Sequence, residues 1–224
     1  MSPGALLIDA VSQRLISEIV DGRLKPGQRI RQAELAERMG VSRAPVSHAL
    51  HLLKQRGLVR ESGKMGVEVV PVSADRVRDL YQIRARLDGL AARLAAARMK
   101  VGDLRSADIG ALRKAFEKGV ESITPDHPLF EQVKDDVAFH RKIYEVCGNT
   151  SIALVMDPLW SHVQRAMVLV LEQGEGRARA WEDHRILLDH ILAGRPDEAE
   201  EHAFQHAAQA GQFTENRLRG HGVQ

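Results

Sequence analysis

The 224-residue chain has one cysteine, Cys147, so no disulfide can form within it. Such sparse use of cysteine is typical of proteins from a reducing compartment. The chain also lacks an apolar run long enough to span a bilayer and an N-terminal segment of the secretory type. These absences argue against a disulfide-stapled secreted domain and a membrane-embedded protein, and they predict a cytoplasmic one.

Aromatic residues make up only 4% of the chain, whereas 44% of it is hydrophobic, which favours helices packed through Leu, Ala and Val over a β-sandwich. A chain of this length is expected to form one or two domains. The formal net charge is only +2, but it is unevenly spread: residues 1–72 hold 11 Lys/Arg against 7 Asp/Glu, and the remainder holds 21 against 23. The small excess of Lys and Arg therefore lies in residues 1–72. DNA binding by these residues would require such an excess there, because DNA phosphates are negatively charged.

The segment Gln32–Leu50 has the pattern of a helix-turn-helix. Apolar residues at helical spacing predict a first helix that ends at Gly40, since glycine adopts a positive φ at little steric cost. Ser42 is a favourable N-cap for a second helix with an apolar inward stripe. The opposite face of this second helix is expected to be free to enter a major groove, and it carries Arg43, Ala44, Ser47, His48, His51 and Lys54.

Two short strands are predicted after this motif, at Leu58–Glu61 and Val67–Val70, around a polar turn that contains Gly63 and Lys64. They predict a hairpin with a basic tip, which is the shape of a wing. A further amphipathic helix, over residues 7–20, precedes the helix-turn-helix. The order of these elements predicts a winged helix-turn-helix DNA-binding domain.

Pro71 marks the expected boundary between this domain, residues 1–72, and the rest of the chain, residues 73–224. Beyond Pro71 the sequence shows amphipathic helical patterns separated by short breaks rich in Gly and Pro. Short connections join antiparallel neighbours. The expected fold is therefore mainly α: a winged helix-turn-helix with a small β-hairpin wing, followed by an all-α antiparallel bundle of six or seven helices.

Several polar residues lie on the apolar faces of the bundle helices. Asp136 and His140 are one turn apart, a spacing that lets a carboxylate and an imidazole meet one ion. His184 and His206 fall on the apolar stripes of two later helices, and His202 is a further candidate one turn before His206. One carboxylate and three neutral imidazoles suit a divalent Zn, Mn, Ni or Fe ion. The alternative is that each histidine is a hydrogen-bonded core residue.

Arg84 also lies on an apolar stripe, in the first helix of the bundle. A buried arginine needs an anion. The interpretation that the sequence favours is an ordinary helix-surface pair with Asp88, one turn further on. The functional alternative is a clamp for a carboxylate effector that enters the bundle.

Four segments carry a resemblance to a known family: LKPGQRIRQAELAERMGVSRAPVSHAL, DLYQIRARLDGLAARLAAAR, DDVAFHRKIYEVCGN and WEDHRILLDHILAGRPDEAEEHAFQH. In this order, and over about Leu6 to Gln209, the chain resembles a GntR-family transcriptional regulator of the FadR type with an FCD effector domain. Its short helical part looks more like the VanR branch. The resemblance implies a bacterial regulator, expected to be a repressor, that binds operator DNA as a homodimer and responds to a small organic acid.

The resemblance also implies roles for individual residues. The Asp and His residues that family members use to bind a divalent metal fall on Asp136, His140, His184 and His206. The arginine of the family's first bundle helix falls on Arg84, which is thereby expected to contact the carboxylate effector.

The recognition helix departs from the family, whose members commonly have V-R-E-A-L where this chain has Val46-Ser47-His48-Ala49-Leu50. This difference implies an altered operator. Arg43 is kept and can make a bidentate contact to guanine. The side chains expected to position the protein on phosphates are Arg31, Ser42 and Lys64.

Two other functions remain open at this stage. The bundle could be a metal-dependent hydrolase, because Asp and His ligands with an open position can activate water. No general base is evident beside the candidate ligands, and the attached winged helix argues against an enzyme. The second alternative is a regulator whose metal is purely structural.

Overall fold

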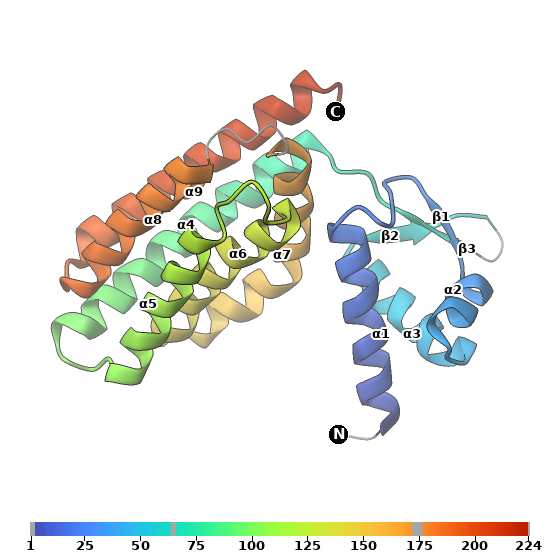
Figure 1. Ribbon diagram of the computed structural model, residues 1–224, viewed down its shortest axis with the longest axis horizontal. Helices are drawn as coiled ribbons and strands as arrows, with labels where there is room; N and C mark the ends of the chain where they lie inside the picture. The colour runs from blue at the N-terminus through green and yellow to red at the C-terminus, as the bar shows by residue number, and fades with distance from the viewer. Residues whose placement is uncertain (1–2, 64–65, 172–176, 224) are drawn as a thin grey trace. The chain divides into compact units, whose positions relative to one another are not determined.

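The computed structural model describes residues 3–63, 66–171 and 177–223 of the chain, so Lys64 lies outside the described residues. The chain divides into two compact units, Met1–Val72 and Ser73–Gln224. The first unit combines three helices with three short strands (Figure 1), in the order α1 (Pro3–Val20), β1 (Arg29–Arg31), α2 (Gln32–Met39), α3 (Arg43–Gln55), β2 (Val59–Glu61) and β3 (Gly66–Val69).

The turn between α2 and α3 has the predicted geometry, because Gly40 adopts φ 66° in the left-handed region. Ser42 occupies the N-cap position of α3, but its side chain makes no capping hydrogen bond, contrary to the expected role. Apolar side chains of α3 pack against α1 in a core that includes Leu15, Val46 and Leu53. This packing fixes the buried face of α3 and leaves its other face exposed.

The wing contains one strand more than the predicted hairpin. β3 pairs antiparallel with both β2 and β1, so the strand order is β1-β3-β2. The sequence Arg29-Ile30-Arg31 has a single apolar residue and no strand signal of its own. It forms a strand because Ile30 pairs with Val67 and is buried with it in the core of this unit.

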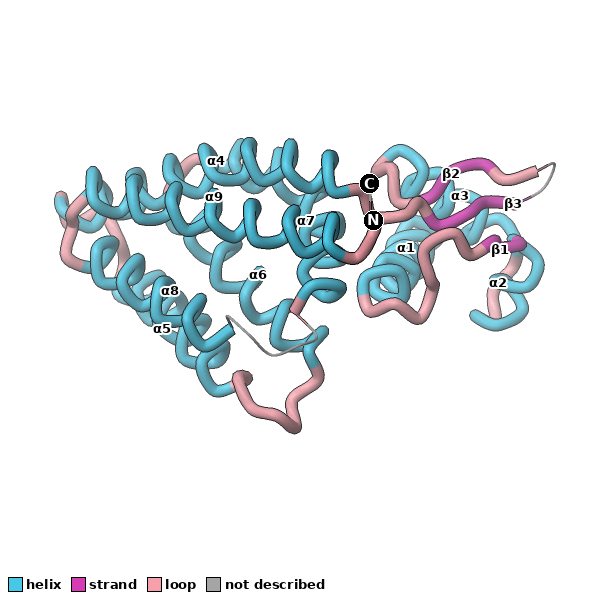
Figure 2. The backbone as a smooth tube through the Cα atoms, turned by 90° about the horizontal axis from the view of Figure 1, so that it is seen from above, coloured by secondary structure: helices cyan, strands magenta, loops and turns pink. Residues whose placement is uncertain are grey.

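The second unit is entirely helical in its described part and contains six helices, which settles the predicted six or seven for these residues. Helices α4 (Ala74–Lys100) and α9 (Pro196–Gly220) lie side by side along most of their length, as both ribbon and tube views show (Figure 2). No described helix is long and apolar enough to cross a membrane. The bounds are α4 (Ala74–Lys100), α5 (Ser106–Glu121), α6 (Leu129–Val146), α7 (Thr150–Val170), α8 (Arg177–Leu192) and α9 (Pro196–Gly220).

The packing of α5 against α8 depends on a missing side chain. A Cβ at Gly119 would overlap the six-membered ring of Trp181, which is buried and packed edge-on against Phe116. Gly119→Ala is therefore expected to cost about 1–3 kcal/mol of unfolding free energy, because an overpacked core must shift. Gly110→Ala on the same helix meets open space, and it should leave stability unchanged or raise it by up to about 1 kcal/mol. Chemical denaturation of both variants measures the difference, and equal midpoints would contradict this packing.

Candidate functional site

The exposed face of α3 presents the side chains that the helix-turn-helix pattern placed there: Arg43, Ala44, Ser47 and His48 are all exposed. The imidazole of His48 lies against its own helix, with Nδ1 3.1 Å from the carbonyl oxygen of Ala44. Donation from Nδ1 would leave Nε2 as an acceptor that points away from the helix backbone. This face can therefore offer hydrogen-bond donors and acceptors to a groove.

A surface hollow of about 530 Å³ lies beside the start of α3 and brings Arg29, Arg31 and Arg43 together with the backbone of Gly66. Arg31 also pairs with Glu34 at 3.3 Å, although both side chains are largely exposed. Gly63, in the turn between β2 and β3, adopts φ 69°. Arg29 was not among the predicted contacts, because its position depends on the unpredicted strand β1.

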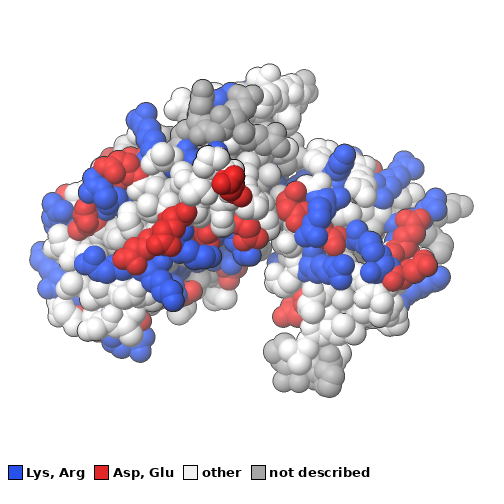
Figure 3. Space-filling view, in the orientation of Figure 1, with Lys and Arg blue, Asp and Glu red and all other residues white. Residues whose placement is uncertain are grey.

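The basic residues of this unit do not form one uninterrupted patch on the visible face. Figure 3 shows Lys and Arg side chains interspersed with Asp and Glu over it. Several arginines are engaged by neighbouring acids, as in the Arg60–Glu68 pair of the sheet. The cations around the hollow beside α3 are therefore a better guide to a DNA contact than the net charge of the unit.

The bundle interior brings together three of the four predicted metal ligands. His140 of α6, His184 of α8 and His206 of α9 each offer a ring nitrogen, and these three atoms lie within 4.8 Å of one another. The Nε2 atoms of His184 and His206 are 3.0 Å apart. Oδ1 of Asp136 is 3.6 Å from Nε2 of His184. The predicted Asp and His set therefore meets at one point, with Asp136 at its edge.

In two of these three histidines a carboxylate lies beside the ring nitrogen Nδ1. Asp88 Oδ2 lies 3.5 Å from Nδ1 of His140, and Asp183 Oδ2 lies 3.6 Å from Nδ1 of His206. An acceptor behind the imidazole is the usual outer partner of a metal-ligating histidine, because it orients the ring and fixes the tautomer. Nδ1 of His184 is buried, and no hydrogen-bond partner in the described part of the chain reaches it.

The buried environment favours the metal-binding, neutral form of His140 and His184. Burial lowers the pKa of His140 well below its ordinary value, and the positive charge of Arg84 adds to this effect. Burial also lowers the pKa of His184 well below its ordinary value, followed by the effect of His206. Burial raises the pKa of Asp136, an effect that the charge of Arg84 opposes. Neutral imidazoles are the state that a divalent ion requires.

Arg84 is not part of an ordinary surface pair, contrary to the interpretation that the sequence favoured. Its expected partner is correct, since Nε donates to Asp88 Oδ2 at 3.1 Å, but both side chains are only 2% exposed. Nη2 donates to Nε2 of His140 at 2.9 Å. The guanidinium also lies over the rings of Tyr81 and Trp160, at 5.2 and 4.8 Å from their centroids. Arg84 thus belongs to the same buried network as the histidines.

A cavity of about 260 Å³ reaches this network. Its wall contains Arg84, Asp136 and His206, together with the apolar side chains of Met167 and Leu171. A small molecule in the cavity would therefore meet a cation, a carboxylate and an imidazole on one side and hydrocarbon on the other. This combination is typical of a pocket for a small polar ligand.

Sequence reasoning missed two parts of the network, and the structure places one of the predicted candidates, His202, outside it. Asp183 precedes His184 in the chain, yet its carboxylate lies beside Nδ1 of His206 on another helix. No spacing pattern within one helix could indicate this contact. Tyr144 donates its hydroxyl to Asp88 and helps to hold that carboxylate. The further candidate His202 instead places Nε2 2.8 Å from the backbone oxygen of Asp183, away from the three-histidine cluster.

Family models match both units of the chain. Residues 7–69 match the bacterial regulatory proteins of the gntR family, and residues 79–209, more than half of the chain, match the FCD domain. The chain belongs to the GntR family. It is a transcriptional regulator with an FCD domain, and because the related proteins are regulators rather than enzymes, the hydrolase alternative is set aside.

Individual relatives agree with this assignment. An HTH-type transcriptional regulator in an unstable DNA locus of Streptomyces ambofaciens is 33% identical over 76% of this chain and 69% of its own length. A probable D-xylose utilization operon transcriptional repressor of Paenarthrobacter nicotinovorans is 28% identical over 86% of this chain and 81% of its own. The solved structure of McbR/YncC from Escherichia coli has a TM-score of 0.80 at 21% identity, covers 97% of this chain and all of its own, and supports the fold alone.

Proposed function

We propose that this GntR-family protein is a repressor whose operator binding is controlled by a small organic acid bound beside a divalent metal in the bundle. The observation that carries the proposal is the meeting of three imidazole nitrogens within 4.8 Å, next to a cavity that also contains Arg84. Repression is supported by relatives described as repressors, among them the D-xylose operon regulator.

The residues present fit a divalent metal. His140, His184 and His206 would hold it, with Asp136 as a fourth ligand from α6, and Asp88 and Asp183 would orient two of the rings. The donor set suits Zn, Mn, Ni or Fe. Such an ion, when bound, supplies a positively charged centre that a carboxylate of the effector can ligate.

Arg84 connects the metal ligands to the effector. Its Nη2 atom donates a hydrogen bond to Nε2 of His140. Nε2 of His140 can therefore ligate a metal only when that hydrogen bond breaks. The released guanidinium donors would then face the cavity whose wall Arg84 forms. Asp88 keeps its contact to Nε, so the charge of Arg84 stays compensated while its outer nitrogens bind an acid.

Operator binding is assigned to α3 and the wing. Arg43, Ala44, Ser47 and His48 would face the major groove, with Arg43 as the contact best suited to guanine. The predicted phosphate contacts are Arg31, Ser42 and Lys64, with Gly63 in the same turn as Lys64, and Arg29 joins them in the hollow beside α3. A homodimer would place two α3 helices on the halves of a pseudo-palindrome.

The test is a gel shift of the purified protein on its binding sequence, which is first selected from a pool of random DNA by repeated rounds of binding. Small carboxylic acids are expected to weaken binding of the metal-loaded protein by roughly 5- to 150-fold, which is a common range for coupling between two sites. Chelation should remove this effect of the acids. Arg43→Ala should weaken specific binding by roughly 5- to 150-fold, because one bidentate base contact is worth about 1–3 kcal/mol, and so serves as the control for α3. If neither acids nor chelation alter DNA binding, the effector part of the proposal fails.

A further inference from the structure

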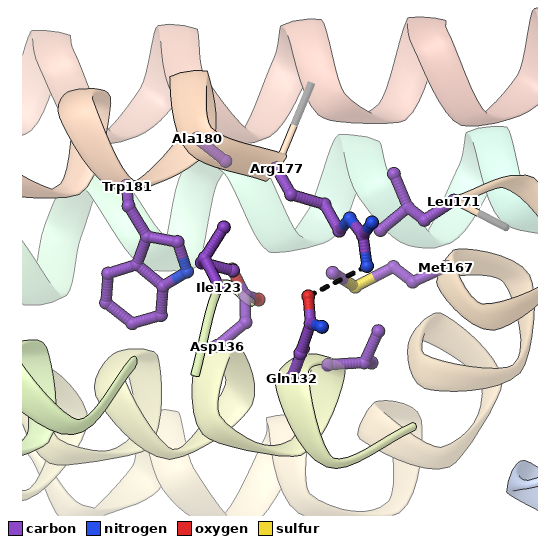
Figure 4. Close-up of a pocket in the computed structure, with 9 residues that line it drawn as sticks. Ile123, Gln132, Asp136, Met167, Leu171, Arg177, Ala180 and Trp181 are labelled. Atoms are coloured by element: carbon purple, nitrogen blue, oxygen red, sulfur yellow. Dashed lines mark hydrogen bonds between the residues drawn. The ribbon is translucent and has the colours of Figure 1, made fainter. Parts of the chain in front are cut away.

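A second, smaller hollow of about 50 Å³ adjoins the effector cavity (Figure 4). The two hollows share Asp136, Met167 and Leu171 in their walls, so they are neighbours around the carboxylate of Asp136. We name the smaller one the annex. Its own polar residues are Gln132 of α6 and Arg177 at the start of α8, and the ring of Trp181 forms one side of it.

Gln132 fixes the position of Arg177. The Gln132 side chain is buried, and its Nε2 donates to the backbone oxygens of Thr124 and His127 at 3.2 and 2.8 Å. These two bonds leave Oε1 as the acceptor for Arg177 Nη1, at 2.8 Å (Figure 4). The guanidinium is thereby held by a neutral amide, which orients it without compensating its charge.

The annex contains a donor and an acceptor that the described residues leave unsatisfied. Arg177 Nε is buried without a hydrogen-bond partner, and no described carboxylate forms an ion pair with this arginine. Oδ2 of Asp136 is also buried without a hydrogen-bond partner, but a carboxylate cannot donate to this acceptor, so Arg177 Nε alone points to a carboxylate ligand. A buried polar atom without a partner costs about 1–3 kcal/mol and calls for an explanation.

An oriented arginine that has no ion-pair partner among the described residues and lines a small hollow matches a carboxylate. The guanidinium can donate to both carboxylate oxygens, and it has donors to spare beyond the one engaged by Gln132. One water needs about 10–15 Å³ of such space, so the annex can admit a group the size of a carboxylate. Met167 and Leu171, common to both hollows, offer an apolar surface to a short hydrocarbon chain between two polar ends.

We propose that the effector is a dicarboxylate, with one carboxylate beside Arg84 and the metal ligands and the second held by Arg177 in the annex. This inference rests on the proposed function, because it specifies the class of acid that the cavity binds. Gln132 acts as a positioning residue, and Arg177 is the group that touches the second carboxylate.

Calorimetry on the full-length, metal-loaded protein tests the proposal. The probes are succinate, glutarate and adipate, each compared with the monocarboxylate of equal chain length: butyrate, pentanoate and hexanoate. At least one diacid is expected to bind roughly 10- to 100-fold more tightly than its monoacid, as charged hydrogen bonds allow. Arg177→Gln should abolish this preference, and Arg177→Lys should restore part of it. Arg185→Gln, an exposed arginine on the same helix, should keep the preference.

Each contrary result has a defined meaning, provided that metal content and DNA binding show the variants to be folded. Equal affinity for diacids and monoacids in the wild type, or a preference that survives in Arg177→Gln, overturns the dicarboxylate and leaves the acid-responsive function standing. An equal loss for both kinds of acid in Arg177→Gln shows a structural role for Arg177 and also overturns it. If none of the six acids binds, both this inference and the proposed acid effector fail.

Discussion

His184→Ala is expected to remove the bound divalent metal and, with it, the response of DNA binding to acids. His184 is fully buried, and its Nε2 lies close to both His206 Nε2 and Asp136 Oδ1, so the substitution deletes the group at the centre of the donor set. Loss of an outer partner of a metal ligand typically lowers metal affinity by roughly 10- to 100-fold, and loss of a direct ligand should exceed this. Metal analysis of the purified variant and titration against a chelating dye measure the change.

The matched control is His190→Ala, which removes a half-buried imidazole from the same helix but outside the cluster. It should leave metal content unchanged. A His184→Ala protein with its full complement of metal would rule out the proposed ligand.

The same variant distinguishes a sensing metal from a purely structural one. For a sensing site, the variant should still bind the operator without acid and should no longer release it when acid is added. For a structural site, metal loss should instead lower the thermal midpoint and abolish DNA binding altogether. The cavity that touches Asp136 and His206 favours the first outcome, because a ligand can reach the donor set.

Asp88→Ala should destabilise the chain by about 3–5 kcal/mol, the typical cost of removing one partner of a buried ion pair. Asp88 receives hydrogen bonds from Arg84 Nε and the Tyr144 hydroxyl, and it lies behind His140. Without it the Arg84 guanidinium stays buried with its charge uncompensated. Urea denaturation of chelator-treated protein measures the loss, since bound metal would add its own stabilisation.

The chain offers a close control in Asp189→Ala. Arg185 and Asp189 form the same i, i+4 pair at the same 3.1 Å, but their side chains are 49% and 57% exposed. Solvent screens such a pair, so its loss should change stability only slightly. Asp88→Asn should fall between the two alanine variants, because the amide oxygen can still accept from Arg84. Equal effects of Asp88→Ala and Asp189→Ala would show that burial does not strengthen the first pair.

The periodicity of apolar residues in the sequence was sufficient to predict the helices. Amphipathic stripes and Gly or Pro breaks predicted the helix-turn-helix and an all-helical second part, because burial of one face repeats along a helix. The turn at Gly40 was likewise predictable, since only glycine adopts that φ at little cost. Strand β1 escaped prediction because its pairing with β3 comes from residues far along the chain.

The bundle site was predictable in its parts but not in its connections. Inward spacing singled out His140, His184 and His206, because a polar residue on an apolar stripe stands out along one helix. The partnership of Asp183 with His206, and that of Arg177 with Gln132, joins different helices, and no spacing within one helix contains that information.

By itself, then, the sequence determined that the chain has a helix-turn-helix with a wing and a helical bundle with inward histidines, because these features depend on local propensity and on one-dimensional periodicity. Only the tertiary structure decided that Arg84 is buried rather than on the surface, that two carboxylates stand behind the histidines, and that a cavity reaches them. The physical reason is that burial and side-chain partners depend on how helices pack, and packing brings together residues that are distant in the chain.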